Sequence, residues 1–94
     1  MKLKNKVAIV TGGSRGIGRA TVERFLRDGA TVILTASSQA SADKAVASIL
    51  EAYPNAPITG IAPDLTNLES VKNALRTVAE KYGKIDILVN NDGL

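Results

Sequence analysis

Short apolar runs alternate with longer amphipathic stretches along the 94-residue chain. Four of these runs are rich in apolar and β-branched residues and predict strands at 6–11, 31–35, 58–61 and 85–89. The stretches between them repeat apolar residues at helical spacing. This spacing predicts helices over 16–28 and 41–53, and a third that follows Thr66 and ends at Gly83.

Each predicted helix has an apolar face, and the third also has a start signal. The expected faces are Ile17, Thr21, Phe25 and Leu26 in the first helix, Ala45, Val46, Ile49, Leu50 and Tyr53 in the second, and Leu68, Val71, Leu75, Val78 and Tyr82 in the third. Thr66-x-x-Glu69 has the pattern of a capping box, which predicts that Thr66 caps the third helix.

The order of the predicted elements is β-α-β-α-β-α-β within a chain short enough for one small domain. Strands that alternate with helices indicate an α/β fold in which right-handed crossovers join parallel strands. Periodicity alone does not set the order of the strands in the sheet.

A glycine-rich turn follows the first strand, with Gly12, Gly13, Gly16 and Gly18 within seven positions. A helix that begins at this turn directs its free N–H groups and its positive dipole end toward the turn, which predicts a site for an anion such as a pyrophosphate. The turn is not a P-loop, because Arg19-Ala20 stands where Lys-Ser/Thr is required. Its spacing also differs from G-x-G-x-x-G. A glycine-rich turn that binds nothing is the alternative.

The segment Thr11-Gly12-x-x-x-Gly16-Ile17-Gly18 resembles the signature of the short-chain dehydrogenase/reductase family. The resemblance implies half of a doubly wound Rossmann fold, with four parallel strands in the order 3-2-1-4. Residues 1–94 are then expected to be a single truncated dinucleotide-binding domain without the catalytic second half. Within the family, the loops look most like those of bacterial 3-oxoacyl-acyl-carrier-protein reductases.

The resemblance also implies a set of cofactor-binding residues. They are Gly12, Ser14, Arg15, Gly16, Ile17, Gly18, Ser37, Ser38, Asp64, Leu65, Asn90 and Gly93. Ala36 takes the position that is usually acidic in NAD-preferring relatives, so no carboxylate repels a 2′-phosphate there. Arg15 could pair with that phosphate, and Ser37 and Ser38 could donate hydrogen bonds, which favours NADP over NAD. Otherwise Arg15 is a solvated loop residue and the serines belong to a turn or an N-cap.

Two further matches follow the third and fourth predicted strands. In the family, an acidic residue at the position of Asp64 bonds the adenine amino group, and the backbone of the next residue contacts the ring. Asp64 could instead be only a turn residue. Asn90-Asn-Asp-Gly93 resembles Asn-Asn-Ala-Gly, in which Asn90 would lie beside the ribose. Asp92 departs from this pattern, and its charge near the pyrophosphate would weaken cofactor binding unless it is exposed.

The resemblance implies hydride transfer between NAD(P)H and a carbonyl or alcohol, assisted by Ser and Tyr-x-x-x-Lys. The tyrosines of this chain, Tyr53 and Tyr82, are followed four positions later by Pro57 and Asp86 and are interpreted as packing residues. Histidine and cysteine are absent, so no catalytic acid or base and no metal site is expected. The chain is therefore expected to bind a nucleotide without catalysis, or to be a truncated or engineered half-domain that folds and self-associates without cofactor binding.

Charge and hydropathy restrict the partners. The net charge is +3, the basic residues are scattered, and there are only three aromatic residues, which argues against a nucleic-acid surface. No apolar run reaches membrane length, and Met1-Lys-Leu-Lys lacks the apolar core of a signal peptide, so a cytoplasmic location is expected. The strand over 85–89 would leave an apolar edge, which predicts a homodimer joined strand four to strand four.

Overall fold

A computed structural model of the chain describes residues 1–91. The elements in chain order are β1 (Val7–Val10), α1 (Gly16–Arg27), β2 (Thr31–Thr35), α2 (Gln39–Ala52), β3 (Ile58–Ile61), α3 (Leu68–Tyr82) and β4 (Ile87–Val89). The predicted order of alternating strands and helices is therefore confirmed. In this part of the chain, no helix is long and apolar enough to cross a membrane.

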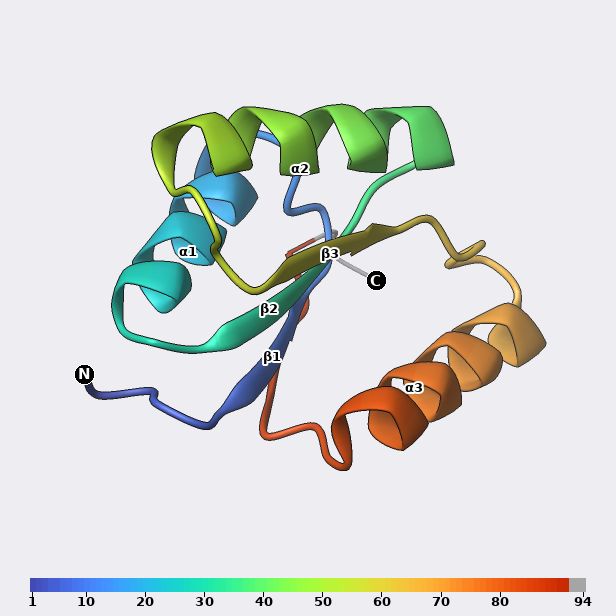
Figure 1. The fold of residues 1–94 in the computed structure, drawn as a ribbon. Coiled ribbons are helices and arrows are strands. Elements are labelled where there is room, and N and C mark those ends of the chain that lie inside the picture. The colour runs from blue at the N-terminus through green and yellow to red at the C-terminus, as the bar shows by residue number, and fades with distance from the viewer. Residues whose placement is uncertain (92–94) are drawn as a thin grey trace.

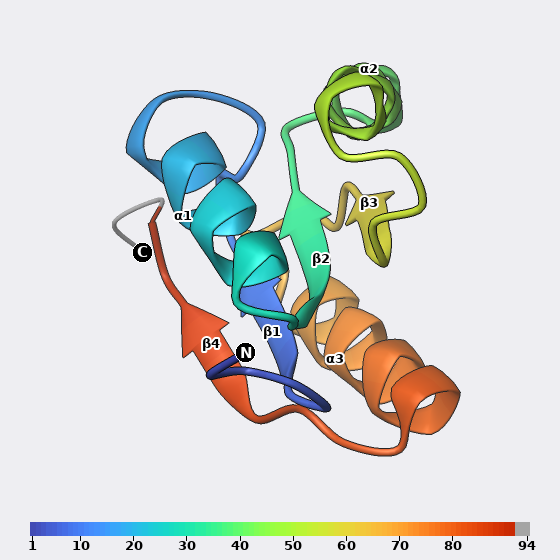
Figure 2. The ribbon, with the colours of Figure 1, turned by 60° about the vertical axis from the view of Figure 1, so that its left-hand side comes forward.

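The strands form one parallel sheet in the order β3-β2-β1-β4. Helices α1 and α2 cover one face of the sheet, and α3 covers the other (Figures 1 and 2). The order 3-2-1-4 and the Rossmann-type half-fold implied by the resemblance are confirmed. Because all the strands are parallel, their carboxyl ends lie at one edge, where the loops that follow them meet.

Alternation along the central strands divides the core into two clusters, one on each face of the sheet. On the face of α1 and α2, the strand residues Val10, Val32 and Leu34 meet Val22 and Ile49. The cluster on the α3 face consists of Val7, Ile9, Ile33 and Val78. The strands β1 and β2 are thus buried on both faces, which explains their nearly continuous apolar sequence.

The predicted apolar face of α1 is wrong at Ile17, whose side chain is 79% exposed. The buried residues of this helix are Gly18 and Val22. Phe25 packs against the same cluster. Gly18, Val22 and Phe25 are four and three positions apart and form one stripe along the helix. Ile17 lies about 100° around the helix from Gly18, outside this stripe.

The start of α3 also differs from the prediction, because Asn67 caps the helix in place of Thr66. The Asn67 side chain accepts a hydrogen bond from the backbone N–H of Ser70 at 3.1 Å. Thr66 instead donates its N–H and its hydroxyl to one carboxylate oxygen of Asp64, at 3.0 and 2.6 Å. Leu68 is then the first helical residue and is 67% exposed, so it does not belong to the buried face.

The fourth strand is shorter than predicted and begins at Ile87. Asp86 makes two hydrogen bonds with Val7, the first residue of β1, one through its side chain and one through its backbone. The Asp86 carboxylate accepts the N–H of Val7, and the N–H of Asp86 donates to the Val7 carbonyl, both at 2.8 Å. Ile85 packs against the cluster on the α3 face without joining the ladder.

Candidate functional site

A groove of about 1160 Å³ opens at the carboxyl-end edge of the sheet. The glycine turn, the loops that follow β2 and β3, and Asn91 contribute to its lining. One face of α2, formed by Ser41, Lys44, Ala45 and Ser48, completes it. The residues come from distant parts of the sequence and meet because parallel strands end at the same edge.

The glycine turn is held in place by the end of β2. The N–H of Gly12 donates to the Thr35 hydroxyl at 3.2 Å, and the N–H of Gly13 donates to the Thr35 carbonyl at 3.1 Å. Thr35 is only 3% exposed, so these bonds lie at the boundary between the core and the groove. Gly12 and Gly16 have φ values of 66° and 62°, which residues with a Cβ adopt at a cost.

Gly18 allows the first turn of α1 to lie directly against the glycine turn. A Cβ at this position would be 2.2 Å from the Gly12 carbonyl oxygen and 2.7 Å from the Asn91 side-chain nitrogen. By contrast, a Cβ on Gly16 would meet nothing within 4 Å, and Gly16 lines the groove. The backbone at Gly16 is thus open to close approach by a ligand.

The N-terminus of α1 differs from those of the other helices. Ser38 caps α2 and Asn67 caps α3 through side-chain hydrogen bonds, whereas Arg15 at the N-cap of α1 makes none. The first turn of α1 also contains no acidic residue. The uncapped N–H groups and the positive end of the helix dipole therefore remain available to an anion beside the open backbone of Gly16. This donor set fits a pyrophosphate.

The other edge of the turn is tied to β4 through Thr11. The single hydrogen of the Thr11 hydroxyl is shared between the Val89 carbonyl and the Asn90 side-chain oxygen, both at 3.3 Å. The hydroxyl oxygen also accepts the N–H of Asn91 at 2.8 Å. Asn90 thus links the end of β4 to the residue that follows β1, but its neighbour Asn91 lines the groove and Asn90 does not, so the ribose contact of Asn90 stays a prediction.

Most of the predicted binding residues come together, but not all face the groove. Those that line it are Gly12, Ser14, Arg15, Gly16, Ser37, Asp64 and Leu65. Ser38 is used differently, because its hydroxyl oxygen accepts the N–H of Ser41 at 3.1 Å as the cap of α2. Gly18 supports the turn from behind, and Ile17 is exposed. Gly93 and the unusual Asp92 lie outside the described residues.

Asp64 stands at the rim of the groove as an ionised carboxylate. The hydrogen bonds from the Thr66 hydroxyl and N–H lower the pKa of Asp64 below its ordinary value. The backbone N–H of Asp64 donates to the Ser70 hydroxyl at 2.9 Å. Its role in the turn is therefore established, and the adenine contact implied by the resemblance stays a prediction.

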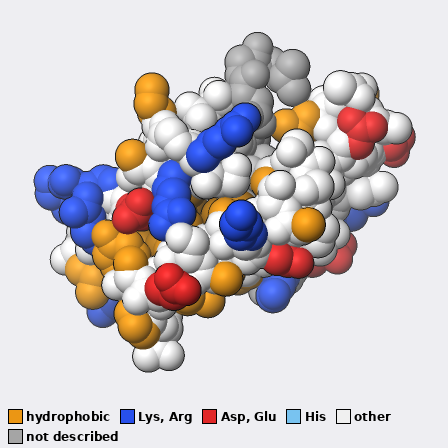
Figure 3. Space-filling view, turned by 90° about the horizontal axis from the view of Figure 1, so that it is seen from above, with side chains coloured by type: hydrophobic (Ala, Val, Ile, Leu, Met, Phe, Trp, Pro, Cys, Tyr) orange, Lys and Arg blue, Asp and Glu red, His pale blue; other side chains and the backbone are white. Residues whose placement is uncertain are grey.

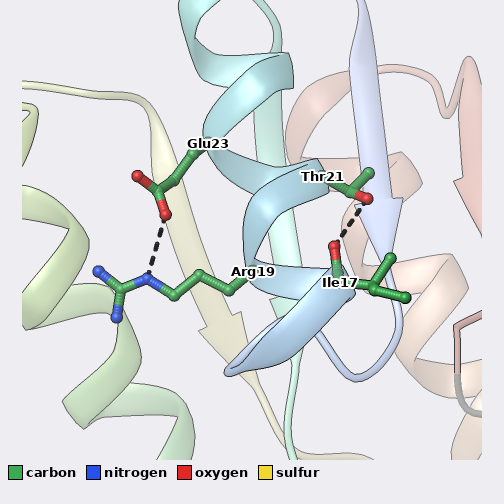
Figure 4. Close-up of polar contacts among 4 residues, drawn as sticks. All are labelled: Ile17, Arg19, Thr21 and Glu23. Atoms are coloured by element: carbon green, nitrogen blue, oxygen red, sulfur yellow. Dashed lines mark hydrogen bonds and ion pairs between the residues drawn. The ribbon is translucent and has the colours of Figure 1, made fainter.

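Positive charge predominates among the described residues of the lining, which include Arg15, Arg19 and Lys44 against one carboxylate, Asp64. In Figure 3, several Lys and Arg side chains stand on the face that carries α1 and α2. Arg19 reaches along α1 toward Glu23, with 3.3 Å between Nε and the carboxylate (Figure 4).

Sequence reasoning missed three residues of the groove lining, Arg19, Ser41 and Lys44. The i, i+3, i+7 spacing of 41, 44 and 48 could have indicated the groove face of α2.

Both tyrosines have packing roles, as predicted. Tyr53 ends α2 and packs against the cluster on that face. Tyr82 packs on the α3 side, and its hydroxyl lies 2.9 Å from the Thr59 hydroxyl. Among residues 1–91, no group of three or more His, Cys, Asp or Glu side chains is arranged to hold a metal ion.

Comparison with known proteins agrees with this architecture. The chain is 49% identical to a 3alpha-hydroxysteroid dehydrogenase of Mediterraneibacter gnavus and 47% identical to a 3-oxoacyl-acyl-carrier-protein reductase of Vibrio harveyi, in each case over all 94 residues. It spans 38% and 36% of the lengths of these two proteins. The crystal structure of gox2181 superposes with a TM-score of 0.87 at 43% identity, over 95% of this chain and 34% of that one.

The family assignment follows from a match along nearly the whole chain. The sequence profile described as short chain dehydrogenase matches residues 6–94. Proteins of this family are oxidoreductases that use nicotinamide cofactors. The chain belongs to the short-chain dehydrogenase family.

Proposed function

We propose that this chain is the nucleotide-binding half of an NADP(H)-dependent short-chain oxidoreductase. The observation that carries the proposal is the uncapped N-terminus of α1, which opens into a groove with an excess of positive charge. A dinucleotide presents a pyrophosphate to such a terminus. The loops that follow β1, β2 and β3 all contribute residues to the lining of this groove.

Each part of the nucleotide has a group of residues to hold it in this proposal. The backbone of Gly12, Ser14 and Gly16 would bind the pyrophosphate, and Asn90 would lie beside a ribose. Asp64 would accept the adenine amino group, with the Leu65 backbone against the ring. When bound, the nicotinamide would supply the hydride-transfer chemistry of the family.

The preference for NADP rests on the loop after β2. Ala36 lines the groove where an acidic residue would favour the ribose 2′-hydroxyl of NAD. Arg15 and Ser37 line it too, and supply a cation and a hydroxyl for a 2′-phosphate. Ser38 is less suited to this role, because capping of α2 already engages its hydroxyl.

We propose further that residues 1–94 form one binding unit that does not itself catalyse the reaction. Tyr82 is engaged with Thr59, and Tyr53 belongs to the core side of α2. Neither is followed at the fourth position by lysine. Reduction of a carbonyl needs a positioned proton donor, which these tyrosines do not provide.

Isothermal titration calorimetry of the purified chain with NADPH and with NADH tests the proposal. We expect saturable binding that is tighter for NADPH, and tighter again for NADPH in an Asp92→Ala variant, because that substitution removes a negative charge. A chain that is folded by circular dichroism but releases no heat up to millimolar NADPH would contradict the proposal.

A second candidate function, self-association without cofactor binding, is favoured by β4. Within the described residues, β4 pairs with β1 on one side only, and Leu88 is 56% exposed. A second copy could pair there to extend the sheet about a two-fold axis. Size-exclusion chromatography with light scattering at high micromolar concentration should then show a dimer, whereas a monomer at that concentration rules this candidate out.

A further inference from the structure

Helix α2 presents a polar stripe to the groove. Ser41, Lys44 and Ser48 follow one another at i, i+3 and i+7, which places them on one side of the helix. Between them, Ala45 is 5% exposed and anchors this side of α2 against the sheet. Because Lys44 flanks a buried anchor, its position beside the groove is fixed by packing, while its long side chain stays exposed.

The charge of Lys44 has no partner among residues 1–91. Three other basic side chains form ion pairs: Arg19 with Glu23 at 3.3 Å, Arg24 with Asp28 at 3.1 Å, and Lys84 with Asp86 at 3.3 Å. In the same part of the chain, no carboxylate lies within 4.0 Å of the charged groups of Lys44 or Arg15.

Lys44 and Arg15 belong to different walls of the groove. Arg15 precedes α1 at the end of the glycine turn, and Lys44 stands on the second turn of α2. The loop residue Ser37 and the α2 residue Ser41 line the same groove and add hydroxyl groups. Two cations that form no ion pair within residues 1–91 line one groove from two different elements, with hydroxyls beside them, and such a set matches a ligand that carries a doubly charged group.

We infer that Lys44 is a specificity-determining residue that contacts the phosphate monoester on the adenosine ribose from the side of α2. The inference rests on the proposed nucleotide-binding function and adds a second cation to the one supplied by Arg15. A phosphate monoester carries a charge of about −1.5 to −2 at neutral pH, so one cation leaves it only partly neutralised. Arg15 has the planar fork that orients the phosphate, and Lys44 supplies a mobile point charge.

The test compares four ligands with and without the 2′-phosphate: NADPH, NADH, adenosine 2′,5′-bisphosphate and adenosine 5′-monophosphate. Their dissociation constants are measured for the unmodified chain and for Lys44→Gln, Lys44→Arg and Lys72→Gln. Lys72 is exposed on α3, on the opposite face of the sheet, and controls for the loss of one positive charge. Thermal melts establish that each variant folds.

Lys44→Gln should weaken NADPH and the bisphosphate roughly three- to tenfold, because an exposed charge-assisted contact contributes on this scale. NADH and the monophosphate should change less than twofold. Lys44→Arg should retain most of the affinity, and Lys72→Gln should retain all of it. The preference of Lys44→Gln for NADPH should also depend less on salt concentration.

Two results would overturn the inference, and they are distinguishable. If the unmodified chain prefers the bisphosphate and Lys44→Gln keeps the same preference, the role of Lys44 is wrong and the proposed function stands. If the folded, unmodified chain binds none of the four ligands, the proposed function and the inference fail together.

Discussion

The strands β2 and β4 flank β1 on its two sides, yet they are packed very differently. Four of the five residues of β2 are buried, and this strand pairs with both β1 and β3. The three residues of β4 are half-buried or exposed, and in the described part of the chain they pair with β1 alone. Both strands nevertheless end beside the groove.

The contrast shows which of the two strands holds the glycines of the turn. On the β2 side, the buried Thr35 holds the N–H groups of Gly12 and Gly13. On the β4 side, Thr11 bonds the Val89 carbonyl through its N–H, at 2.9 Å, and through its hydroxyl, and its contacts with Asn90 and Asn91 are exposed. Water competes for the contacts with Asn90 and Asn91 more easily than for those with Thr35, so the glycines of the turn are held mainly from β2.

Truncation of a core residue in β2 should have the largest effect. Ile33 is fully buried, so Ile33→Ala should lower the free energy of unfolding by about 2–5 kcal/mol in urea titrations followed by circular dichroism. Ile87→Ala in β4 is the matched control and should cost less than half as much, because Ile87 is only half-buried. Equal losses would mean that the two strands are equally packed in solution.

Removal of the Thr35 hydroxyl tests directly whether β2 holds the glycine turn. Thr35→Val keeps the shape of the side chain but leaves the N–H of Gly12 without its acceptor, which should cost about 1–3 kcal/mol in the same titration. It should also weaken NADPH binding. Thr31→Val, at the other end of β2, should be close to neutral, and a similar loss at both positions would argue against a special role for the turn.

Asp86 allows a smaller test at the start of β4. The hydrogen bond from the Val7 N–H and the charge of Lys84 hold the pKa of Asp86 below its ordinary value, against the opposing effect of burial. A pKa lowered by folding stabilises the protein above the unfolded value, about 3.9, and this contribution is lost as the pH falls through the folded value.

The Asp86→Asn variant should therefore be less stable than the unmodified chain at pH 7, by less than Thr35→Val. The difference should shrink as the pH falls below about 3.9. Melting temperatures between pH 2 and pH 7 measure it, with the exposed Glu80→Gln as the control for a lost surface charge. A difference that grows toward acid would have the wrong sign.

Leu88→Ser should have the smallest effect on stability, within about 0.5 kcal/mol, because the side chain is 56% exposed. If the edge of β4 mediates self-association, the same variant should shift the dimer toward monomer in light-scattering measurements. A dimer of unchanged affinity would place the interface elsewhere.

The sequence predicted the architecture well because its signals are local and repeated. The apolar runs and Gly83 marked elements that the structure confirms. The family resemblance supplied the strand order that periodicity left open. The errors fall where neighbouring residues compete for one role. Thr66 and Asn67 are both good caps, and the bond of Thr66 to Asp64 leaves Asn67 to cap α3.

The candidate site was less predictable, because it depends on which way side chains face after folding. Ser37 and Ser38 are identical in type, but only Ser37 lines the groove while Ser38 caps α2. Lys44 belongs to no glycine motif and reaches the groove only through the packing of Ala45. Such placement follows from tertiary contacts that a local pattern does not encode.

The link between Thr11 and Asn91 has a consequence for the order in which the molecule forms. Their hydrogen bond joins residues 80 positions apart. Contacts of such long range require a large loop to close, and they form slowly compared with the local turns of a helix. The glycine turn can take shape once β2 has paired with β1, but the groove acquires its last wall only when β4 docks. During synthesis on the ribosome, a ligand of the groove would therefore meet a finished site only after nearly all of the described residues have emerged.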